Sequence, residues 1–322
     1  ISDLKKFNKF KKVVVIGMGG SILGAEAIYD FLSYKIRKKF YFFNDLNYEK
    51  LKKFRKNENL SKSLFIIISK SGNTIETISN LSYLKILKKN AKNLIIISEN
   101  TDNFLSHLSK IYKIKFIEHK NFLGGRFSVL SEVGLVPAYF MGLNIKKLRV
   151  DLNRYLKTEE KSFLRKSSIL LSSIMKSKKY NNIIFLNYCP ELEKFLFWNQ
   201  QLISESLGKK GNGLLPVISN APKDHHSLLQ LYIDGPKDKI FYIFSKKKSL
   251  EEKIYLNKKL KKFQYLNNKN IFEIKNAQKN AVIKVFKKNK IPFREFSIQS
   301  FKEETLGQLF SYFMLETAIV GK

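Results

Sequence analysis

The chain has 322 residues, enough for about two domains of ordinary size. Hydrophobic residues make up 44% and aromatic residues 13%, which excludes a disordered tail or a solvating basic arm. The formal net charge is +33, but the lysines are spread over the whole chain beside many Ile, Asn, Phe and Tyr residues, so we interpret the charge as compositional bias and expect no nucleic-acid partner.

A strand, a glycine turn and a helix follow one another near the N-terminus. Residues 13–16 form a β-branched run of strand length, residues 17–21 read GMGGS, and residues 22–28 have apolar side chains at helical spacing. The same order returns at 64–68, and a third apolar run covers 94–97. Continuous apolar strands separated by helices predict a parallel sheet covered on both faces.

The polar segment 146–166 is the best candidate for a boundary, and we divide the chain there into residues 1–148 and 149–322. Beyond it the alternation of strands and helices resumes, so the sequence predicts two α/β halves. In the second half we expect strands at 183–186, 214–218, 239–244 and 293–298, and a closing amphipathic helix at 305–321.

The loop 69–74 (SKSGNT) places three hydroxyl groups and one amide directly before a helix, with Glu76 as the first carboxylate. The N-terminus of a helix presents unpaired N–H groups and the positive end of its dipole, which favours an anion. An ordinary helix cap would explain one hydroxyl but not the whole cluster. The loop can therefore bind a phosphomonoester without a metal. The loop 17–21 lacks the full spacing of a dinucleotide or P-loop motif, so a sugar phosphate is favoured.

Four segments resemble the signatures of the phosphoglucose isomerase (glucose-6-phosphate isomerase) family, in the family's order and spacing: 17–21, 69–77, 124–128 (GGRFS) and 205–209 (ESLGK). The similarity continues through the histidine segment 224–231 to the closing helix. It implies two sugar isomerase (SIS) domains, each a doubly wound parallel sheet in a three-layer αβα sandwich. It also implies a homodimer whose active sites take residues from both subunits.

Aldose–ketose isomerisation moves a proton between C1 and C2 through an enediolate, and it needs a carboxylate base, a cation near the oxyanion and a ring-opening group. The resemblance assigns these roles to Glu205, Arg126 and His226, with Glu76 orienting the histidine. The neighbouring His225 leaves the choice of ring-opening histidine open. Without the flanking motifs, Glu205 would read as a solvated glutamate and Arg126 as a surface ion-pair partner.

The resemblance also implies a set of substrate-binding residues: Gly19, Gly20, Ser21, Ser69, Lys70, Ser71, Asn73 and Thr74.

The sequence departs from the family pattern at three places. Asn73 and Leu207 stand where the family usually has threonine and asparagine. The family continues past the closing helix into a segment with a further catalytic lysine, whereas this chain ends at Lys322 and begins with Ile1. We therefore expect a fragment truncated at both ends that lacks one ring-opening group.

No cofactor and no metal are expected, since four histidines leave little material for a zinc site. The single Cys189 excludes an internal disulfide, and a reducing, cytoplasmic setting is the default. Lysines interrupt every apolar run well before the roughly 18 residues that span a bilayer, so no membrane partner is expected.

The leading interpretation is reversible isomerisation of glucose 6-phosphate and fructose 6-phosphate. One alternative is a bifunctional phosphoglucose and phosphomannose isomerase, which turnover of mannose 6-phosphate would reveal. Another is a non-catalytic SIS sensor of phosphosugars, but such sensors lack the pair Glu205 and Arg126. Nucleic-acid binding through the charge would show as a salt-dependent gel shift.

Overall fold

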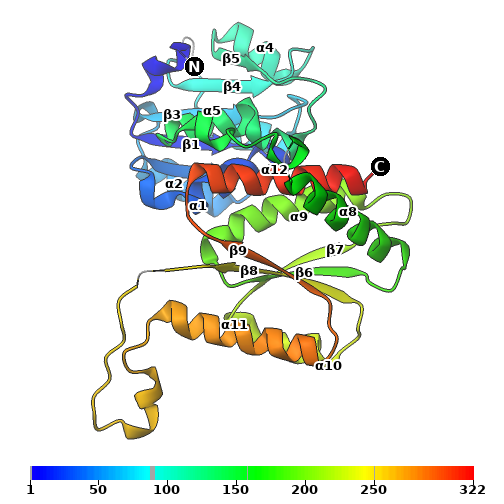
Figure 1. Ribbon diagram of the computed structural model, residues 1–322. Coiled ribbons are helices and arrows are strands. Elements are labelled where there is room, and N and C mark those ends of the chain that lie inside the picture. The colour runs from blue at the N-terminus through cyan, green and yellow to red at the C-terminus, as the bar shows by residue number, and fades with distance from the viewer. Residues whose placement is uncertain (1, 88–90, 158, 250) are drawn as a thin grey trace.

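The computed structural model describes residues 2–87, 91–157, 159–249 and 251–322. It contains two parallel β-sheets, one above the other in Figure 1, and helices cover both faces of each sheet. The predicted α/β class with two three-layer, doubly wound halves is therefore confirmed.

The first sheet, sheet A, has the strand order β2-β1-β3-β4-β5, and every neighbouring pair is parallel. From the central pair the chain winds outward in both directions, so the strand order reverses between β1 and β3. In open α/β sheets this switch point is where ligands bind, beyond the carboxyl ends of the strands. The strands are β1 (Lys12–Ile16), β2 (Lys39–Phe43), β3 (Ser63–Ile68), β4 (Leu94–Ser98) and β5 (Lys115–Glu118).

The strands of sheet A have apolar residues on both faces because helices cover both. Val13 and Val15 point into one hydrophobic cluster, and Val14 and Ile16 point into another. The first face carries α1 (Leu23–Phe31) and α5 (Glu132–Phe140); the second carries α2 (Tyr48–Asn57), α3 (Ile75–Leu84) and α4 (Phe104–Ile111).

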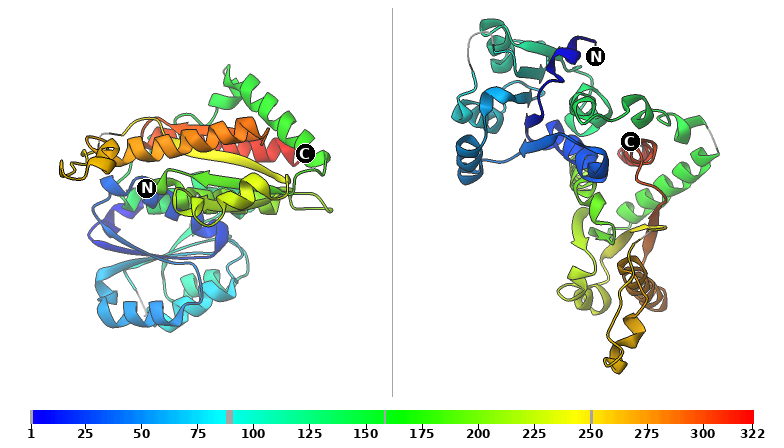
Figure 2. Two further views of the ribbon diagram at one scale, coloured as in Figure 1. Left: turned by 90° about the horizontal axis from the view of Figure 1, so that it is seen from below. Right: turned by 90° about the vertical axis from the view of Figure 1, so that its left-hand side faces the viewer.

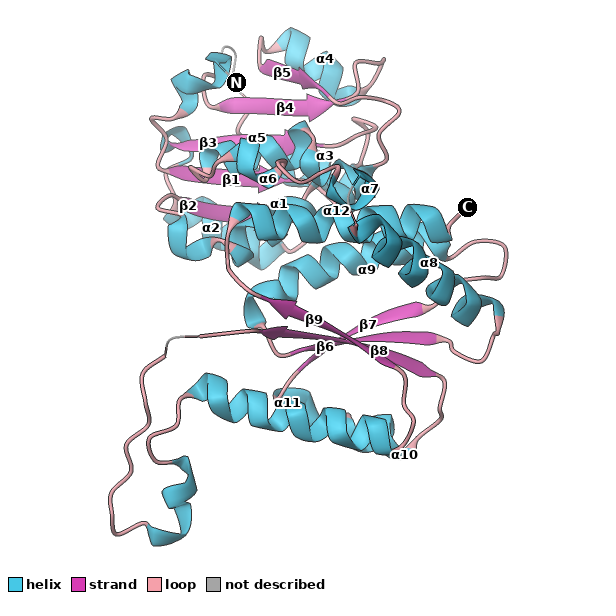
Figure 3. Ribbon diagram, in the orientation of Figure 1, coloured by secondary structure: helices cyan, strands magenta, loops and turns pink. Residues whose placement is uncertain are grey.

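The second sheet, sheet B, has the order β7-β6-β8-β9, again with parallel pairs only (Figure 3). Its switch point lies between β6 and β8. The strands are β6 (Asn182–Asn187), β7 (Leu215–Asn220), β8 (Lys239–Lys246) and β9 (Phe293–Ile298). One face carries α8 (Glu160–Lys176), α9 (Glu193–Leu207) and α12 (Glu303–Val320); the other carries α10 (Leu229–Asp234) and α11 (Ile271–Lys288).

A single hydrophobic cluster joins the two halves. It contains Val13 and Ile66 of sheet A, Phe185 and Phe244 of sheet B, and residues of α1, α5, α9 and α12 between them. Helices α9 and α12 lie between the two sheets in Figure 1.

The predicted boundary at residues 148 and 149 falls in the connection between the sheets, which contains α6 (Ile145–Leu148) and α7 (Arg154–Lys157). Because α12, from the end of the chain, packs on α6, helices of both predicted domains meet there. The division 1–148 and 149–322 therefore stays a prediction.

The connection between β8 and α11 is long, and residues 251–270 project from the body in all three views of Figures 1 and 2. This arm exposes the rings of Tyr255 and Tyr265. Among the described residues, none of the helices has the length and apolar character needed to cross a bilayer. Within the same residues, nowhere do three or more histidine, cysteine or acidic side chains gather as metal ligands.

A partly buried arginine, Arg294, fixes α12 to sheet B. The Arg294 side chain leaves β9 and donates to Glu316 Oε1 at 3.0 Å, to the Tyr242 hydroxyl at 2.9 Å, and to the Tyr312 hydroxyl. Its guanidinium also lies 4.7 Å from the centre of the Tyr242 ring. The Glu316 side chain is only 2% exposed, so its charge depends on this partner.

Replacing Arg294 by methionine should therefore leave Glu316 buried and uncompensated. We expect Arg294→Met to lower the free energy of unfolding in urea by about 3–5 kcal/mol. The double variant with Glu316→Gln should recover part of that loss because the unpaired charge is gone. Arg149→Met, at an exposed position, is the matched control and should change stability little. Equal stability of the two arginine variants would contradict this account.

Candidate active site

The glycine loop after β1 lies against the loop that carries Arg126. It forms the short helix η2 (Gly19–Ser21), which packs on the short helix η5 (Gly125–Leu130). A Cβ atom on Gly20 would lie 2.3 Å from the carbonyl carbon of Gly125, so no side chain fits there. Gly19 has a φ of +50°, and a Cβ on it would lie 2.7 Å from Gln201 Nε2. Gly20 therefore allows the two loops to approach closely, and Gly19 leaves room for the side chain of Gln201 on α9.

Arg126 and Glu205, from opposite halves of the chain, meet beside this loop. Arg126 Nη1 lies 3.1 Å from Glu205 Oε2, and Arg126 Nε donates to Ser206 Oγ at 2.7 Å. The indole of Trp198 donates to the Arg126 carbonyl at 3.2 Å and so fixes its backbone. The side chains of Arg126 and Glu205 are 23% and 48% exposed, so a ligand can reach both. The predicted base and the predicted cation are therefore neighbours.

Gln201 belongs to the same group, although the sequence analysis did not single it out. It lies one turn before Glu205 on α9, and its Nε2 donates to Glu205 Oε1 at 2.6 Å. Its Oε1 is buried and has no hydrogen-bond partner among the described residues. The spacing of four residues on a helix was the signal that could have identified it. Gln201 holds the carboxylate from the side opposite Arg126.

The loop 69–74 lies at the carboxyl end of β3, beside the glycine loop across the switch point of sheet A. Ser69 Oγ and Thr74 Oγ1 are 2.7 Å apart. Thr74 is the N-cap residue of α3, but no side chain accepts a hydrogen bond from the first turn of that helix. The exposed Ser71 and the N–H groups of this turn are thus open to an anion.

Two residues of this loop that were predicted to bind the substrate already form contacts within the protein through their side chains. Asn73 Oδ1 accepts from the N–H of Phe104 at 2.9 Å, which leaves only its NH2 group for a ligand. The Lys70 ammonium donates to the Asn121 carbonyl at 3.0 Å and lies 3.5 Å from Glu99. The Lys70 side chain is therefore directed toward the protein.

A buried histidine, which the sequence analysis also missed, holds the segment between β5 and Arg126. His119 is 2% exposed; its Nδ1 bonds to Glu132 at the start of α5, and its Nε2 lies 3.2 Å from the Leu123 carbonyl. Burial, the largest single influence, raises the pKa of Glu132, but the hydrogen bond from His119 and those from backbone N–H groups together outweigh burial and lower this pKa below its ordinary value.

The two histidines of the segment 224–231 differ in their surroundings. His225 Nε2 is 2.7 Å from the Tyr188 hydroxyl, and burial, together with the nearby charge of His226, lowers the pKa of His225. His226 is exposed and lies beyond the end of β7. Among the described residues, neither His226 nor Glu76 forms a hydrogen bond or ion pair with Glu205 or Arg126. One chain therefore brings together the predicted base and cation, but not the predicted ring-opening pair.

The alignments with known proteins include the residues of this candidate site. A family model described as phosphoglucose isomerase matches residues 4–215. The chain belongs to the phosphoglucose isomerase family. A glucose-6-phosphate isomerase of Methanocaldococcus jannaschii is 34% identical over 334 residues, which cover 100% of this chain and 81% of that protein. One of Mycoplasmopsis synoviae is 33% identical over 339 residues, covering 95% and 76%.

A solved structure of the same family has the same fold. The crystal structure of a glucose-6-phosphate isomerase from Chlamydia trachomatis superposes with a TM-score of 0.80 at 18% identity, covering 98% of this chain and 66% of the other. At this identity the likeness concerns the fold alone. The predicted family and the predicted pair of parallel-sheet domains are thus confirmed, whereas the roles of single residues stay predictions.

The pair His119–Glu132 gives a stability prediction with a defined pH range. Because the pKa of Glu132 is lowered by folding, its contribution is present above the ordinary value of 4.5 and is lost as the pH falls through the folded value. At pH 7 we expect Glu132→Gln to be less stable in urea by about 1–3 kcal/mol. This difference should shrink at pH 3.5. Glu118→Gln, at an exposed ion pair, is the control and should show little difference at either pH.

Proposed function

We propose that this protein catalyses the reversible isomerisation of glucose 6-phosphate and fructose 6-phosphate. The observation that carries the proposal is the contact of 3.1 Å between Arg126 and Glu205, next to a loop suited to a phosphate. Its family membership supports the same activity, since curated relatives at 30–34% identity are named glucose-6-phosphate isomerases.

The phosphate of the substrate would bind at the loop 69–74. Ser71, the NH2 group of Asn73 and the first N–H groups of α3 are neutral donors that face solvent there. Ser69 and Thr74, hydrogen-bonded to each other, complete the loop. Gly19, Gly20 and Ser21, across the switch point, leave room for the sugar chain to approach the backbone.

Glu205 would act as the base. In the open-chain aldose it removes the proton from C2, and the electrons of that bond form the enediolate with the C1 carbonyl oxygen becoming the oxyanion. Arg126 stabilises this oxyanion because its charge is fixed at every working pH. A proton then moves from the C2 hydroxyl to the C1 oxygen, and return of the proton from Glu205 to C1 gives the ketose with its carbonyl at C2. Each step is a proton transfer or a hydrogen bond made by side chains of the protein.

Ring opening would need His226, which we place in the active site of a partner subunit. Its exposure and the lack of a described partner in its own chain support this assignment, while His225 is held by Tyr188. Glu76 would orient the histidine of the other subunit. This arrangement requires a homodimer, the commonest form of a symmetric oligomer. The buried Cys189, whose thiol pKa is raised by burial, suits the reducing cytoplasm that we propose as its location.

The proposal is tested by exchange of the C2 proton of glucose 6-phosphate with solvent deuterium, followed by NMR. We expect Glu205→Gln to slow exchange by about 100-fold or more, because the base is lost while the fold is kept. Glu252→Gln, at an exposed position of the arm, is the control and should exchange like the unchanged protein. Exchange that is unaffected by Glu205→Gln would contradict the proposal, and mannose 6-phosphate in the same assay reports a broader specificity.

The same assay on a mixture of inactive variants tests the shared site. Glu205→Gln and His226→Asn should each be nearly inactive when folded and assayed alone. After co-refolding, a mixed dimer has one site with both native groups, so about a quarter of the normal activity should return. If Glu205 and His226 of one chain served the same site, the mixture would stay inactive. A native mass measurement shows whether mixed dimers have formed.

A further inference from the structure

Sheet B has a switch point of its own, and the proposed isomerase reaction does not use it. The chain leaves β6 toward β7 through α9 on one face, and it leaves β8 toward β9 through α11 on the other. The carboxyl ends of β6 and β8 therefore border a crevice, as those of β1 and β3 do in sheet A. Ligands of open α/β sheets bind in this kind of crevice.

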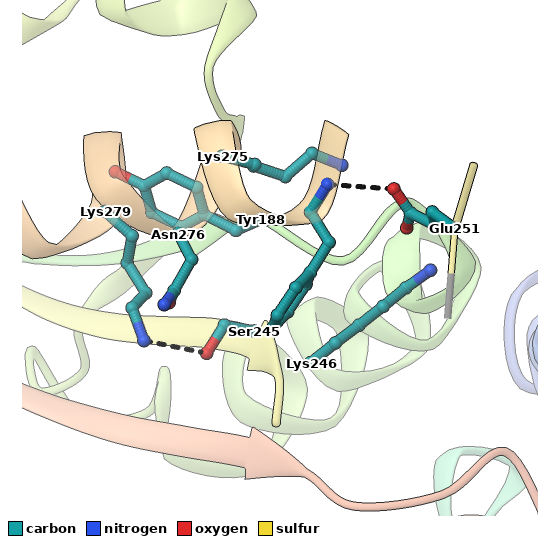
Figure 4. A pocket seen from close by; sticks show the side chains of 8 residues that line it. Tyr188, Ser245, Lys246, Glu251, Lys275, Asn276 and Lys279 are labelled. Carbon is teal, nitrogen blue, oxygen red and sulfur yellow. Dashed lines mark hydrogen bonds between the residues drawn. The ribbon is translucent and has the colours of Figure 1, made fainter. Parts of the chain in front are cut away.

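A pocket occupies this crevice, and Figure 4 shows it from close by. It measures about 300 Å3, the solvent at its mouth included. Its walls come from the ends of both strands and from the first turns of α11. The lining residues are Tyr188, Ser245, Lys246, Glu251, Phe272, Lys275, Asn276 and Lys279.

The three lysines of the pocket are not ordinary surface lysines. In a chain with 60 lysines and arginines, exposed lysines alone would carry no argument. However, the side chains of Lys246 and Lys279 are only 18% and 12% exposed. Lysine is almost never buried unless it is paired. The largely buried ammonium groups of Lys246 and Lys279 at one pocket therefore indicate that the pocket requires negatively charged partners.

The protein supplies only part of that negative charge. Lys246 pairs with Glu191 at 2.7 Å, outside the pocket wall. Lys279 lies 3.9 Å from Glu295, which is beyond hydrogen-bond distance, and donates to Ser245 Oγ at 3.4 Å. Lys275 has no hydrogen bond or ion pair within the described part of the chain. Among the described residues, Lys275 and Lys279 thus have no carboxylate within hydrogen-bond distance.

The one carboxylate in the wall is already used. Glu251 Oε2 accepts from the N–H of Phe272 at 2.8 Å, and its Oε1 accepts from Ser249 Oγ at 2.7 Å. It therefore binds the first turn of α11, and within the described residues it forms no ion pair with the three lysines. With Asn276 as a further neutral donor, the pocket is rich in donors and positively charged.

We propose that this pocket binds a phosphate group, either as inorganic phosphate or at the end of a small phosphate monoester. Ammonium groups act as point charges for phosphate and do not need the planar geometry that carboxylates offer to arginine. This site is separate from the loop 69–74, because it belongs to the other sheet.

Binding of radioactive inorganic phosphate in equilibrium dialysis at about 0.15 M KCl tests the proposal, since at this ionic strength long-range attraction to the basic surface is largely screened. The unchanged chain should bind two phosphates, one in each crevice. Lys275→Ala with Lys279→Ala should remove one of them. Ser71→Ala with Thr74→Ala should remove the other, so that failure of the active-site proposal is seen separately.

The matched control is Lys287→Ala with Lys288→Ala, which removes the same charge from exposed positions at the other end of α11. It should keep both phosphates. If the pocket variant binds as many phosphates as this control, the proposal is wrong. Should the double variant not fold, Lys275→Gln serves instead, because no described partner of Lys275 is lost; we expect it to weaken binding at this site about tenfold. Competition by glycerol phosphate then distinguishes a monoester site from a site for free phosphate alone.

Discussion

The buried apolar layer between the two sheets is the constraint on which the active site depends. Helix α1, which follows the glycine loop of sheet A, packs along α9, which covers sheet B. Because α9 is fixed by this contact, its C-terminal turn lies beside the loops of the first half. Glu205 and Ser206 then reach Arg126 with no further adjustment. The packing of two helices thus positions Glu205 and Arg126, which are 79 residues apart in the chain and which we propose as base and cation.

Within the arrangement fixed by the two helices, close approach of backbone segments determines how the loops at the edge of sheet A pack. Gly20 faces Gly125 with no room for a Cβ atom, and Gly72 has a φ of +68° at a place where a Cβ would lie 1.9 Å from Asn103 Oδ1. Neither place tolerates a larger residue without movement of the backbone. The glycines of the motifs are therefore requirements of loop-to-loop packing as much as of ligand binding, and they bring N–H groups and hydroxyls to the same edge of sheet A.

Much of the fold could be predicted from the sequence because central parallel strands are buried on both faces and form continuous apolar runs. All seven predicted strands are present: β1, β3, β4, β6 and β8 are apolar runs of this kind, and the edge strands β7 and β9 were predicted as well. The edge strands β2 and β5 were missed: side chains of both are partly exposed, and β5 has only two apolar residues between Lys115 and Glu118. Helix α11 was missed because polar residues dominate it and a long arm precedes it.

Residues of the candidate site could be predicted from the sequence only where they belong to a short motif. Arg126 and Glu205 stand in short patterns that can be read along the chain, and the structure brings them together. His119 acts through Glu132, 13 residues further along the chain, so this contact appears only in the folded chain. Gln201 lies outside the motifs, and only its helical spacing from Glu205 could have pointed to it. The position of His226, away from Glu205, likewise depends on which edge of sheet B carries β7.

The crevices of sheet A and sheet B differ in the charge of the groups that could bind an anion. In sheet A the donors of the phosphate loop are neutral, and the one cation of that loop, Lys70, is drawn toward Glu99. A second cation beside Glu205 would stabilise its ionised form and make it a weaker base, which would oppose proton abstraction from carbon. In sheet B no proposed base lies beside the lysines, so ammonium groups can supply the attraction directly. The same topology therefore offers two proposed anion sites, and the proposed role of Glu205 as a base at one of them would account for the neutral donors there.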